Sequence, residues 1–512
     1  MISNNPNYTK KALTLIAAFA LLRLIISFAG QLGNDESYYW LYSQHIKSNY
    51  FDHPPMIALW IRASTLNLWL QDFPGFIRLA SVCSGATASW FMYRCVALIS
   101  TERAGIIAVC LYNASFYAGA IAGIYAFPDA PQMVFWTASL WCVAAIFRNE
   151  KNRVNWLLFG ICTGLCIMSK VHGIFLWIGM GCYILFYKRS WLTNPYLYAA
   201  LLISLIICSP ILLWNIHYNF LTWRFNEARI NTTNEHLNWA DFFNEAWGQL
   251  SMNNAVNVII TVIALANWKK KSLQQYDALK LFNCAGLLHA GILLAISLHR
   301  QTLSHWSGPA YVTLIPAASI YLDTINITVA NRIARLSMTL YVLVIVISLW
   351  FTYFFPGNIG AHSKRFMGFG DKSLDLYGWK NAGEKFDSIY DVQIANHSIA
   401  SNTPMVCNSW WGAHIEYYYC RPLDIQMIGL GDIMNLHEYA WMNTLRKDSV
   451  NMQKAFCIVP SYGPYNPRTA YKDYYNIIDS ITTIPVMRGD KPAANFYVYK
   501  LSGWKGTMPL EK

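Results

Sequence analysis

Charged residues are scarce in this chain of 512 residues, and their scarcity argues against a single soluble domain. Only 13% of the residues are Asp, Glu, Lys or Arg, whereas 55% are hydrophobic. A typical soluble domain has about 25% charged residues. Apolar runs rich in Leu, Ile, Ala and aromatic residues recur up to residue 355, and they are too long and too frequent for one soluble core. The composition therefore predicts a multispanning membrane protein.

The chain also lacks internal repeats and the Cys and His spacing of a zinc site. Of its 12 cysteines, all but Cys407, Cys420 and Cys457 lie in or beside apolar runs, where a thiol acts as a small hydrophobic group. In an oxidising compartment two of these three can pair, and Cys407 with Cys420 is the first candidate.

The apolar runs predict about eleven spans, because roughly 20 apolar residues cross the hydrocarbon core of a bilayer. The expected spans are 11–31, 76–99, 104–124, 130–147, 154–170, 171–187, 196–214, 243–267, 278–298, 307–325 and 336–355. The first run has no small-residue cleavage site and continues directly to Asp35, so we interpret it as a retained helix and not a signal peptide.

Lys and Arg mark the cytoplasmic side, because short cytoplasmic loops hold an excess of them. Lys10 and Lys11 precede the first span, which places the N-terminus inside. Every second loop thereafter is also basic, with these residues: Arg94, Arg103, Arg148, Lys151, Arg153, Lys188, Arg189, Lys269, Lys270, Lys271, Arg332 and Arg335. The net charge of +12 is thus mainly a topology signal, and no nucleic-acid partner is expected.

Residues 356–512 have ordinary polarity and, with about eleven crossings before them, are expected outside. The strand-like runs are Pro404–Cys407, Ala455–Val459 and Asn495–Leu501. Helical stretches are expected near Leu376–Tyr390 and Asp432–Arg446. The predicted fold is an α-helical polytopic membrane domain, 1–355, followed by a periplasmic α/β domain, 356–512.

The first external loop, about 32–75, is long and contains two adjacent carboxylates, Asp35 and Glu36. Helical periodicity over 36–47 and 55–70 indicates two helices lying along the membrane surface. Charges at this depth are costly unless they are solvated or used. The structural alternative is a helix N-terminus, with Asp35 as the cap and Glu36 favouring the helix dipole.

Further polar residues are expected on the same external side, and several of them are basic, against the topology signal. They are Asp129, Lys170, Arg224, His305 and Trp306. Each has a structural alternative: a turn residue for Asp129, a snorkelling lysine for Lys170, and a backbone-bonded interfacial histidine for His305. Their gathering on one face nevertheless favours a site for phosphate. A carboxylate base together with cations for an anionic leaving group suggests glycosyl transfer from a lipid phosphate.

Six motifs together resemble the bacterial GT-C glycosyltransferases of the family 39 type, relatives of protein O-mannosyltransferases and lipid A aminoarabinose transferases. The motifs are Asn34–Trp40, Tyr50–Pro55, Pro128–Pro131, Ser169–Lys170, Ser209–Asn215 and His305–Tyr311. The resemblance covers nearly the whole chain, and it rests on the order and spacing of the motifs.

The resemblance implies a polyprenyl-phosphate sugar as donor and Asp35 as the catalytic residue. Asp35 would take the proton of an acceptor hydroxyl that attacks the anomeric carbon and displaces the lipid phosphate, with inversion. Glu36 would orient Asp35 or the acceptor. Asp129 matches a second carboxylate of the family and, with Asp52 and Tyr38, is assigned to positioning the sugar or the acceptor.

We assign the donor phosphate and sugar to six residues: Tyr50, His53, Lys170, Arg224, His305 and Trp306. Two positions depart from the aminoarabinose transferases. His53 stands where they have a lysine, and Tyr38 where they have an arginine. The chain is therefore not expected to be a close aminoarabinose transferase, and its sugar stays open.

The expected location is the bacterial inner membrane, with the active site on the periplasmic face and membrane lipids around the spans. The acceptor stays open among lipid A, another glycolipid, a polysaccharide and a protein. No cofactor or metal is expected to be required, although four carboxylates, on Asp35, Glu36, Asp52 and Asp129, would suit a divalent ion. The alternatives are a lipid-linked sugar transporter or flippase, which would be expected to show inverted repeats and mid-span charges, and a membrane-anchored receptor.

Overall fold

The computed structural model describes residues 6–230, 237–268, 271–506 and 508–509. The chain forms two compact units. The first unit comprises 1–29 and 46–344, and the second comprises 30–45 and 345–512. Segment 30–45 was expected in the first loop of the membrane domain, but it packs with the C-terminal residues.

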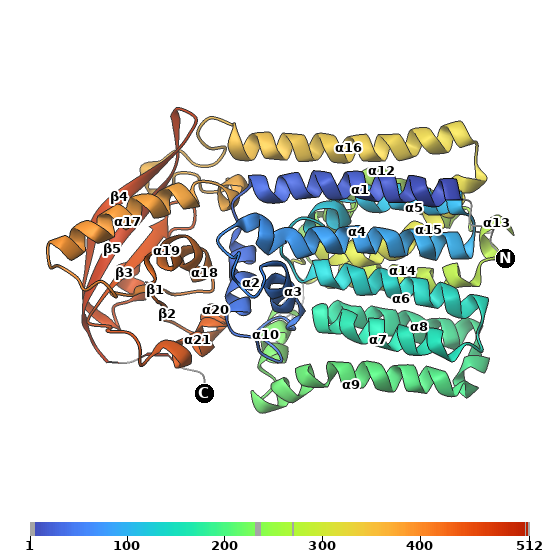
Figure 1. Ribbon diagram of the computed structural model, residues 1–512, viewed down its shortest axis with the longest axis horizontal. Helices are drawn as coiled ribbons and strands as arrows, with labels where there is room; N and C mark the ends of the chain where they lie inside the picture. Colours follow the sequence, from blue (N-terminus) through green and yellow to red (C-terminus); the bar gives the residue numbers. More distant parts are fainter. Residues whose placement is uncertain (1–5, 231–236, 269–270, 507, 510–512) are drawn as a thin grey trace. The chain divides into compact units, whose positions relative to one another are not determined.

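Long apolar helices dominate the first unit. Among the described residues, six helices are long and apolar enough to cross a membrane: α1 (Pro6–Ala29), α4 (Pro74–Ile99), α6 (Asp129–Arg148), α9 (Pro195–His217), α14 (Asp277–Ser297) and α16 (Ile327–Tyr353). Two shorter apolar helices, α7 (Arg153–Ser169) and α8 (Ile174–Tyr187), accompany them. Helix α4 packs against α1 and α6, and α7 packs against α6 and α9 (Figure 1).

Two expected spans are not continuous helices. In place of 104–124, helix α5 (Glu102–Ala114) is followed by a π-helix, Tyr117–Ile121. In place of 243–267, helices α11 (Trp239–Met252) and α12 (Ala255–Ala266) meet at an angle of 100°. Asn254 lies between them with φ of 67° and caps α12 with its side chain. Counting this bent pair as one span gives up to seven crossings in the described part, and the count of about eleven stays a prediction.

The remaining helices of the first unit are shorter. They are α3 (Met56–Ser64), α10 (Leu221–Ile230), α13 (Lys271–Gln274) and α15 (Gly308–Thr324). The helix expected over 55–70 ends early, because Leu66, Asn67 and Leu68 all have positive φ. Three consecutive residues in this conformation cannot continue a right-handed helix.

The second unit is built on a sheet of five strands in the order β2-β1-β3-β5-β4. The strands are β1 (Met405–Cys407), β2 (Met427–Gly429), β3 (Lys454–Pro460), β4 (Tyr475–Arg488) and β5 (Lys491–Trp504). Strand β1 is parallel to β2 and β3, and β5 is antiparallel to β3 and β4. The three expected strand runs are thus confirmed.

Helices of the second unit begin with α2 (Asn34–Gln44), which was expected over 36–47. The others are α17 (Trp379–Ala395), α18 (Gly412–Ile415), α19 (Arg421–Leu423), α20 (Ile433–Leu436), α21 (Tyr439–Arg446) and α22 (Pro467–Ala470). The helix expected over Asp432–Arg446 is divided at His437, which has φ of 51°. Cys407 and Cys420 are buried free thiols and do not form the candidate pair.

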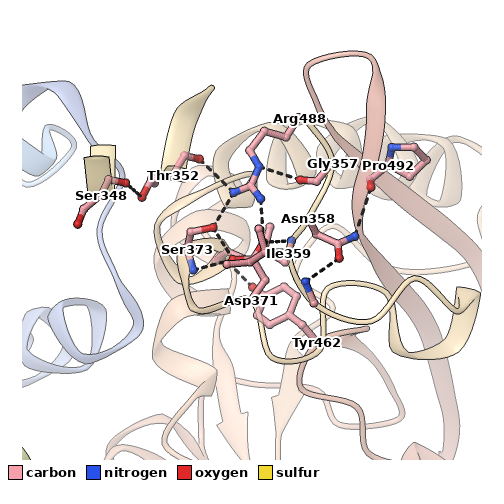
Figure 2. A network of polar contacts seen from close by, with 12 residues as sticks. Ser348, Thr352, Gly357, Asn358, Ile359, Asp371, Ser373, Tyr462, Arg488 and Pro492 are labelled. Atoms are coloured by element: carbon pink, nitrogen blue, oxygen red, sulfur yellow. Dashed lines mark hydrogen bonds and ion pairs between the residues drawn. The ribbon is translucent and has the colours of Figure 1, made fainter. Parts of the chain in front are cut away.

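A buried arginine at the end of β4 ties several segments of the second unit together (Figure 2). Arg488 donates to Asp371 Oδ2 over 2.7 Å, to Ser373 Oγ over 2.6 Å and to the Gly357 carbonyl over 2.8 Å. It also donates to the carbonyl of Thr352, in the last turn of α16, over 3.2 Å. The ion pair between Arg488 and Asp371 is fully buried, so these hydrogen bonds compensate for the loss of water around its two charges.

Candidate active site

The candidate residues fall into two groups, one in each compact unit. Asp35, Glu36 and Tyr38 lie on α2, in the second unit. The larger group, in the first unit, consists of Tyr50, Asp52, His53, Asp129, Lys170, Arg224, His305 and Trp306. We describe each group by itself.

Asp35 differs from its neighbours in exposure. It lies in the first turn of α2 and is exposed, whereas residues 32–34 and 36–43 are all buried. Glu36 is 1% exposed, and its Oε2 accepts a hydrogen bond from the N–H of Gly33 over 2.9 Å. The two carboxylates therefore have different surroundings: Glu36 fastens the start of the helix, and Asp35 faces outward.

A third carboxylate, Asp375, reaches the start of α2 from the C-terminal part of the chain. Its two oxygens lie 3.3 and 3.2 Å from the amide nitrogen of Asn34. The hydroxyl of Tyr418 accepts from the N–H of Leu32 over 2.7 Å. These groups satisfy amides that a helix N-terminus otherwise leaves unpaired. Asp375 was not singled out from the sequence, since no local motif surrounds it.

Tyr38 is buried at 2% exposure, which differs from the surface position that contact with an acceptor would need. Its ring lies against Tyr42, Trp410 and His437, with centroid distances of 4.8, 5.3 and 6.0 Å. Its hydroxyl accepts from the N–H of Glu438 over 3.4 Å. In this structure Tyr38 packs α2 against Trp410 and His437 of the same unit.

In the first unit, Asp129 and Lys170 form a buried ion pair. Asp129 begins α6, and Lys170 follows the last residue of α7. Lys170 Nζ lies 2.9 Å from each carboxylate oxygen, with side-chain exposures of 5% and 3%. The hydroxyl of Tyr117, in the π-helix, donates to Asp129 Oδ1 over 2.8 Å. Tyr117 was missed because it lies inside a run that we assigned to a span.

His305 belongs to the same neighbourhood. It lies in the short 3-10 helix Ser304–Ser307, and burial lowers the pKa of its imidazole to about 4. The charge of Lys170 lowers that pKa further, Asp129 opposes the shift, and His53 adds to it. The imidazole of His305 is therefore neutral near pH 7, and Asp129 is the group that balances the charge of Lys170. Trp306 lies beside this group, with its ring centroid 5.7 Å from that of His172.

The loop that carries Tyr50, Asp52 and His53 packs against α10. Thr222 Oγ1 donates to the Phe51 carbonyl over 2.9 Å, and the Phe51 and Phe225 rings lie 4.8 Å apart. This contact brings the helix of Arg224, whose side chain is exposed, to the loop of His53.

Within the loop, Asp52 and His53 approach to 4.0 Å between Oδ2 and Nε2. The Tyr50 N–H donates to the His53 carbonyl over 3.1 Å, which closes the turn. Tyr50 is 1% exposed, and its hydroxyl accepts from the Lys47 N–H over 3.3 Å. The ring and hydroxyl of Tyr50 thus shape the loop, whereas Asp52 and His53 are partly exposed at 14% and 24%.

Two residues near the ion pair were not singled out from the sequence. Gln132, one turn after Asp129 on α6, and His289, on α14, are both fully buried. Neither side-chain nitrogen of His289 nor either amide atom of Gln132 has a hydrogen-bond partner among the residues that the structure describes. Across residues 6–230, 237–268, 271–506 and 508–509, no group of three or more His, Cys, Asp or Glu side chains is arranged to hold a metal ion.

Comparison with known proteins confirms the resemblance found in the sequence. Residues 52–214 match the family described as dolichyl-phosphate-mannose-protein mannosyltransferase. The structure of ArnT from Cupriavidus metallidurans in the apo state superposes with a TM-score of 0.61 at 12% identity, covering 96% of this chain and 98% of that one. The same protein bound to undecaprenyl phosphate gives 0.57 at 15% identity, covering 95% and 97%. No curated protein sequence matches the chain.

Proposed function

From the family match and the GT-C glycosyltransferase fold of this chain, we propose that it is an inverting glycosyltransferase that uses a polyprenyl-phosphate sugar. The sugar passes to an envelope acceptor, which is lipid A, another glycolipid, a polysaccharide or a protein. The reaction takes place at the periplasmic face of a bacterial inner membrane. The ArnT structure that holds undecaprenyl phosphate supports this class of donor.

The observation that carries the proposal is the exposure of Asp35 at the start of a buried helix. Asp35 is accessible to a hydroxyl group, and its neighbours on α2 are packed away from solvent. A rigid helix can hold a base close to the attacking oxygen. For a weak base such as a carboxylate, this placement matters more than the strength of the base. The proton of the acceptor hydroxyl goes to Asp35, the new bond forms at the anomeric carbon, and the lipid phosphate leaves with the electrons of the broken bond.

The first-unit group is assigned to the donor. A phosphate that approaches Lys170 competes with Asp129 for the same ammonium group, and a neutral His305 can donate one hydrogen bond to it. Arg224 and His53 supply further cationic or donor groups in this unit. Asp129 is released toward sugar hydroxyls when the phosphate takes its partner.

Sugar transfer in membrane vesicles tests the proposal. Vesicles receive a panel of polyprenyl-phosphate sugars, and mass spectrometry follows glycolipids and proteins for the mass increment of one sugar. We expect Asp35→Asn to lower transfer by about 10²- to 10⁴-fold, the usual contribution of a general base. The matched control is Asp72→Asn, because Asp72 is another exposed carboxylate before α4. Equal transfer by Asp35→Asn and wild type would remove Asp35 as the base.

One observation favours a second candidate, a transporter of lipid-linked sugars. The 100° break between α11 and α12 is the type of broken helix that transporters use at their binding sites. The same vesicles separate the two functions. A transporter moves labelled donor across the bilayer and produces no acceptor with an added sugar.

A further inference from the structure

The start of α2 is held by residues that follow it by more than 300 positions in the chain. Asp375 accepts from the N–H of Asn34, the residue directly before Asp35. The imidazole Nε2 of His414 lies 3.0 Å from the Leu32 carbonyl. The position of Asp35 is therefore set by the C-terminal residues of the second unit.

The backbone that carries Asp375 is anchored on both sides of this residue. Asp375 lies in the 3-10 helix Lys372–Leu376, which Asp371 caps by accepting from the Ser373 N–H over 3.0 Å. Asp371 is fixed in turn by the buried Arg488 (Figure 2). The carbonyl of Leu374 accepts from Trp379 Nε1 over 3.2 Å. Both ends of this short helix are thus anchored to the second unit.

The approach between Asp375 and α2 is close. A Cβ atom placed on Gly33 would come within 2.8 Å of Asp375 Oδ2, so the absence of a side chain at residue 33 lets the carboxylate reach the backbone. Asp375 is half-buried, so its charge is only partly screened by solvent.

We propose that Asp375 is a positioning residue for Asp35: it fixes the first turn of α2 and, when ionised, places a second negative charge near the base. This inference rests on the proposed role of Asp35. A nearby negative charge makes a carboxylate hold a proton more tightly, which strengthens it as a general base. The two carboxylates then titrate as a coupled pair.

The charges that face Asp375 support this role. Burial raises the pKa of Asp375 to about 7, the Asn34 N–H opposes the shift, and Asp35 and Glu36 add to it. Lys372 lowers it slightly, and the phenol of Tyr462 is the other titratable group facing the carboxyl. Asp375 therefore becomes ionised as the pH rises through about 7, and the base at Asp35 becomes stronger over the same interval.

Transfer by the full chain in vesicles between pH 5 and 9 tests the inference. In wild type we expect kcat to rise about two- to fivefold between pH 6 and 8. In Asp375→Asn, whose amide oxygen still accepts from Asn34, that rise is absent. Asp479→Asn removes an exposed carboxylate of the same unit and keeps the wild-type profile. A pH profile of Asp375→Asn that superimposes on wild type overturns the inference.

Hydrogen exchange of residues 33–44 gives a second readout that does not depend on activity. Asp375→Ala loses both the charge and the acceptor, so these amides should exchange at least about tenfold faster than in wild type, with Asp375→Asn close to wild type. Unchanged exchange in Asp375→Ala contradicts the fixing of α2. If Asp35→Asn transfers sugar normally, both the role of Asp35 and this inference are overturned. If Asp35→Asn is inactive but the pH profile of Asp375→Asn matches that of wild type, only the inference is overturned.

Discussion

Lys170 illustrates what a charge inside a helical unit requires. Its ammonium group contacts both oxygens of Asp129, and the pair is almost fully buried. Removing one member of a buried pair leaves an uncompensated charge, at a typical cost of 3–5 kcal/mol. In the proposed donor role, the phosphate would replace Asp129 as the anion paired with Lys170.

Variants of the pair distinguish a donor site from a structural pair. We expect Lys170→Ala to raise the KM for the polyprenyl-phosphate sugar by about 10- to 100-fold, the value of a charged hydrogen bond, with a smaller effect on the acceptor. Asp129→Asn removes the anion that competes with the phosphate for Lys170, so it should change the KM for the donor less than Lys170→Ala does. Steady-state kinetics measure both. If Lys170→Ala weakens acceptor binding more than donor binding, the residue belongs to the acceptor site.

Residue patterns predicted the members of this group but not their bonds. The sequence predicts both Asp129 and Lys170 as external polar residues. The two residues are 41 positions apart, and nothing in the local pattern shows that they share two hydrogen bonds. Tyr117 lies in an apolar run, and the sequence pattern does not distinguish a tyrosine that packs through its ring from one whose hydroxyl has a polar partner. Pairing across elements depends on packing, which local periodicity does not encode.

At the scale of elements, Arg488 joins the end of β4 to the segments that precede it in the second unit. Its guanidinium reaches Asp371 at the cap of one short helix and Thr352 in the last turn of α16 (Figure 2). A planar fork of five donors suits such a multiple contact, which a lysine does not reproduce.

We expect Arg488→Met to destabilise the second unit by about 3–5 kcal/mol, because Asp371 stays buried without its partner. Thermal unfolding of the full chain in detergent, followed by proteolysis of residues 345–512, measures the loss. Arg468→Met is the matched control, because Arg468 is exposed and should change stability by no more than about 0.5 kcal/mol. Equal stability of the two variants would show that the buried network contributes little.

Helices and strands were largely predictable where one pattern extends over many residues. Long apolar runs predicted α1, α4, α6 and α9, and alternating or β-branched runs predicted β1, β3 and β5. The breaks were not predictable. Asn253 and Asn254 lie at the bend, and Gly119 lies in the π-helix after α5. Isolated residues of these types also occur inside continuous apolar helices, so they do not mark a break by themselves.

At the scale of the whole molecule, the two-unit organisation sharpens the topology prediction. Segment 30–45 and residues 356–512 belong to one compact unit, so we expect them on the same side of the membrane. A reporter fused after residue 360 should read periplasmic, and a control fusion after Lys188 should read cytoplasmic. A cytoplasmic signal from the first fusion would place Asp35 in the cytoplasm as well and would contradict a periplasmic reaction.

The long separation between α2 and its partners has a consequence for biosynthesis. Leu32 bonds Tyr418, 386 residues later, and Asn34 bonds Asp375, 341 residues later. At about 5–20 residues per second, a ribosome needs roughly 17–77 s to supply those partners after α2 has been synthesised. During that interval the nascent α2 has no sheet to pack against, and its aromatic face is open to chaperones and proteases. A premature stop codon anywhere before residue 375 would therefore leave an already translated Asp35 without its support.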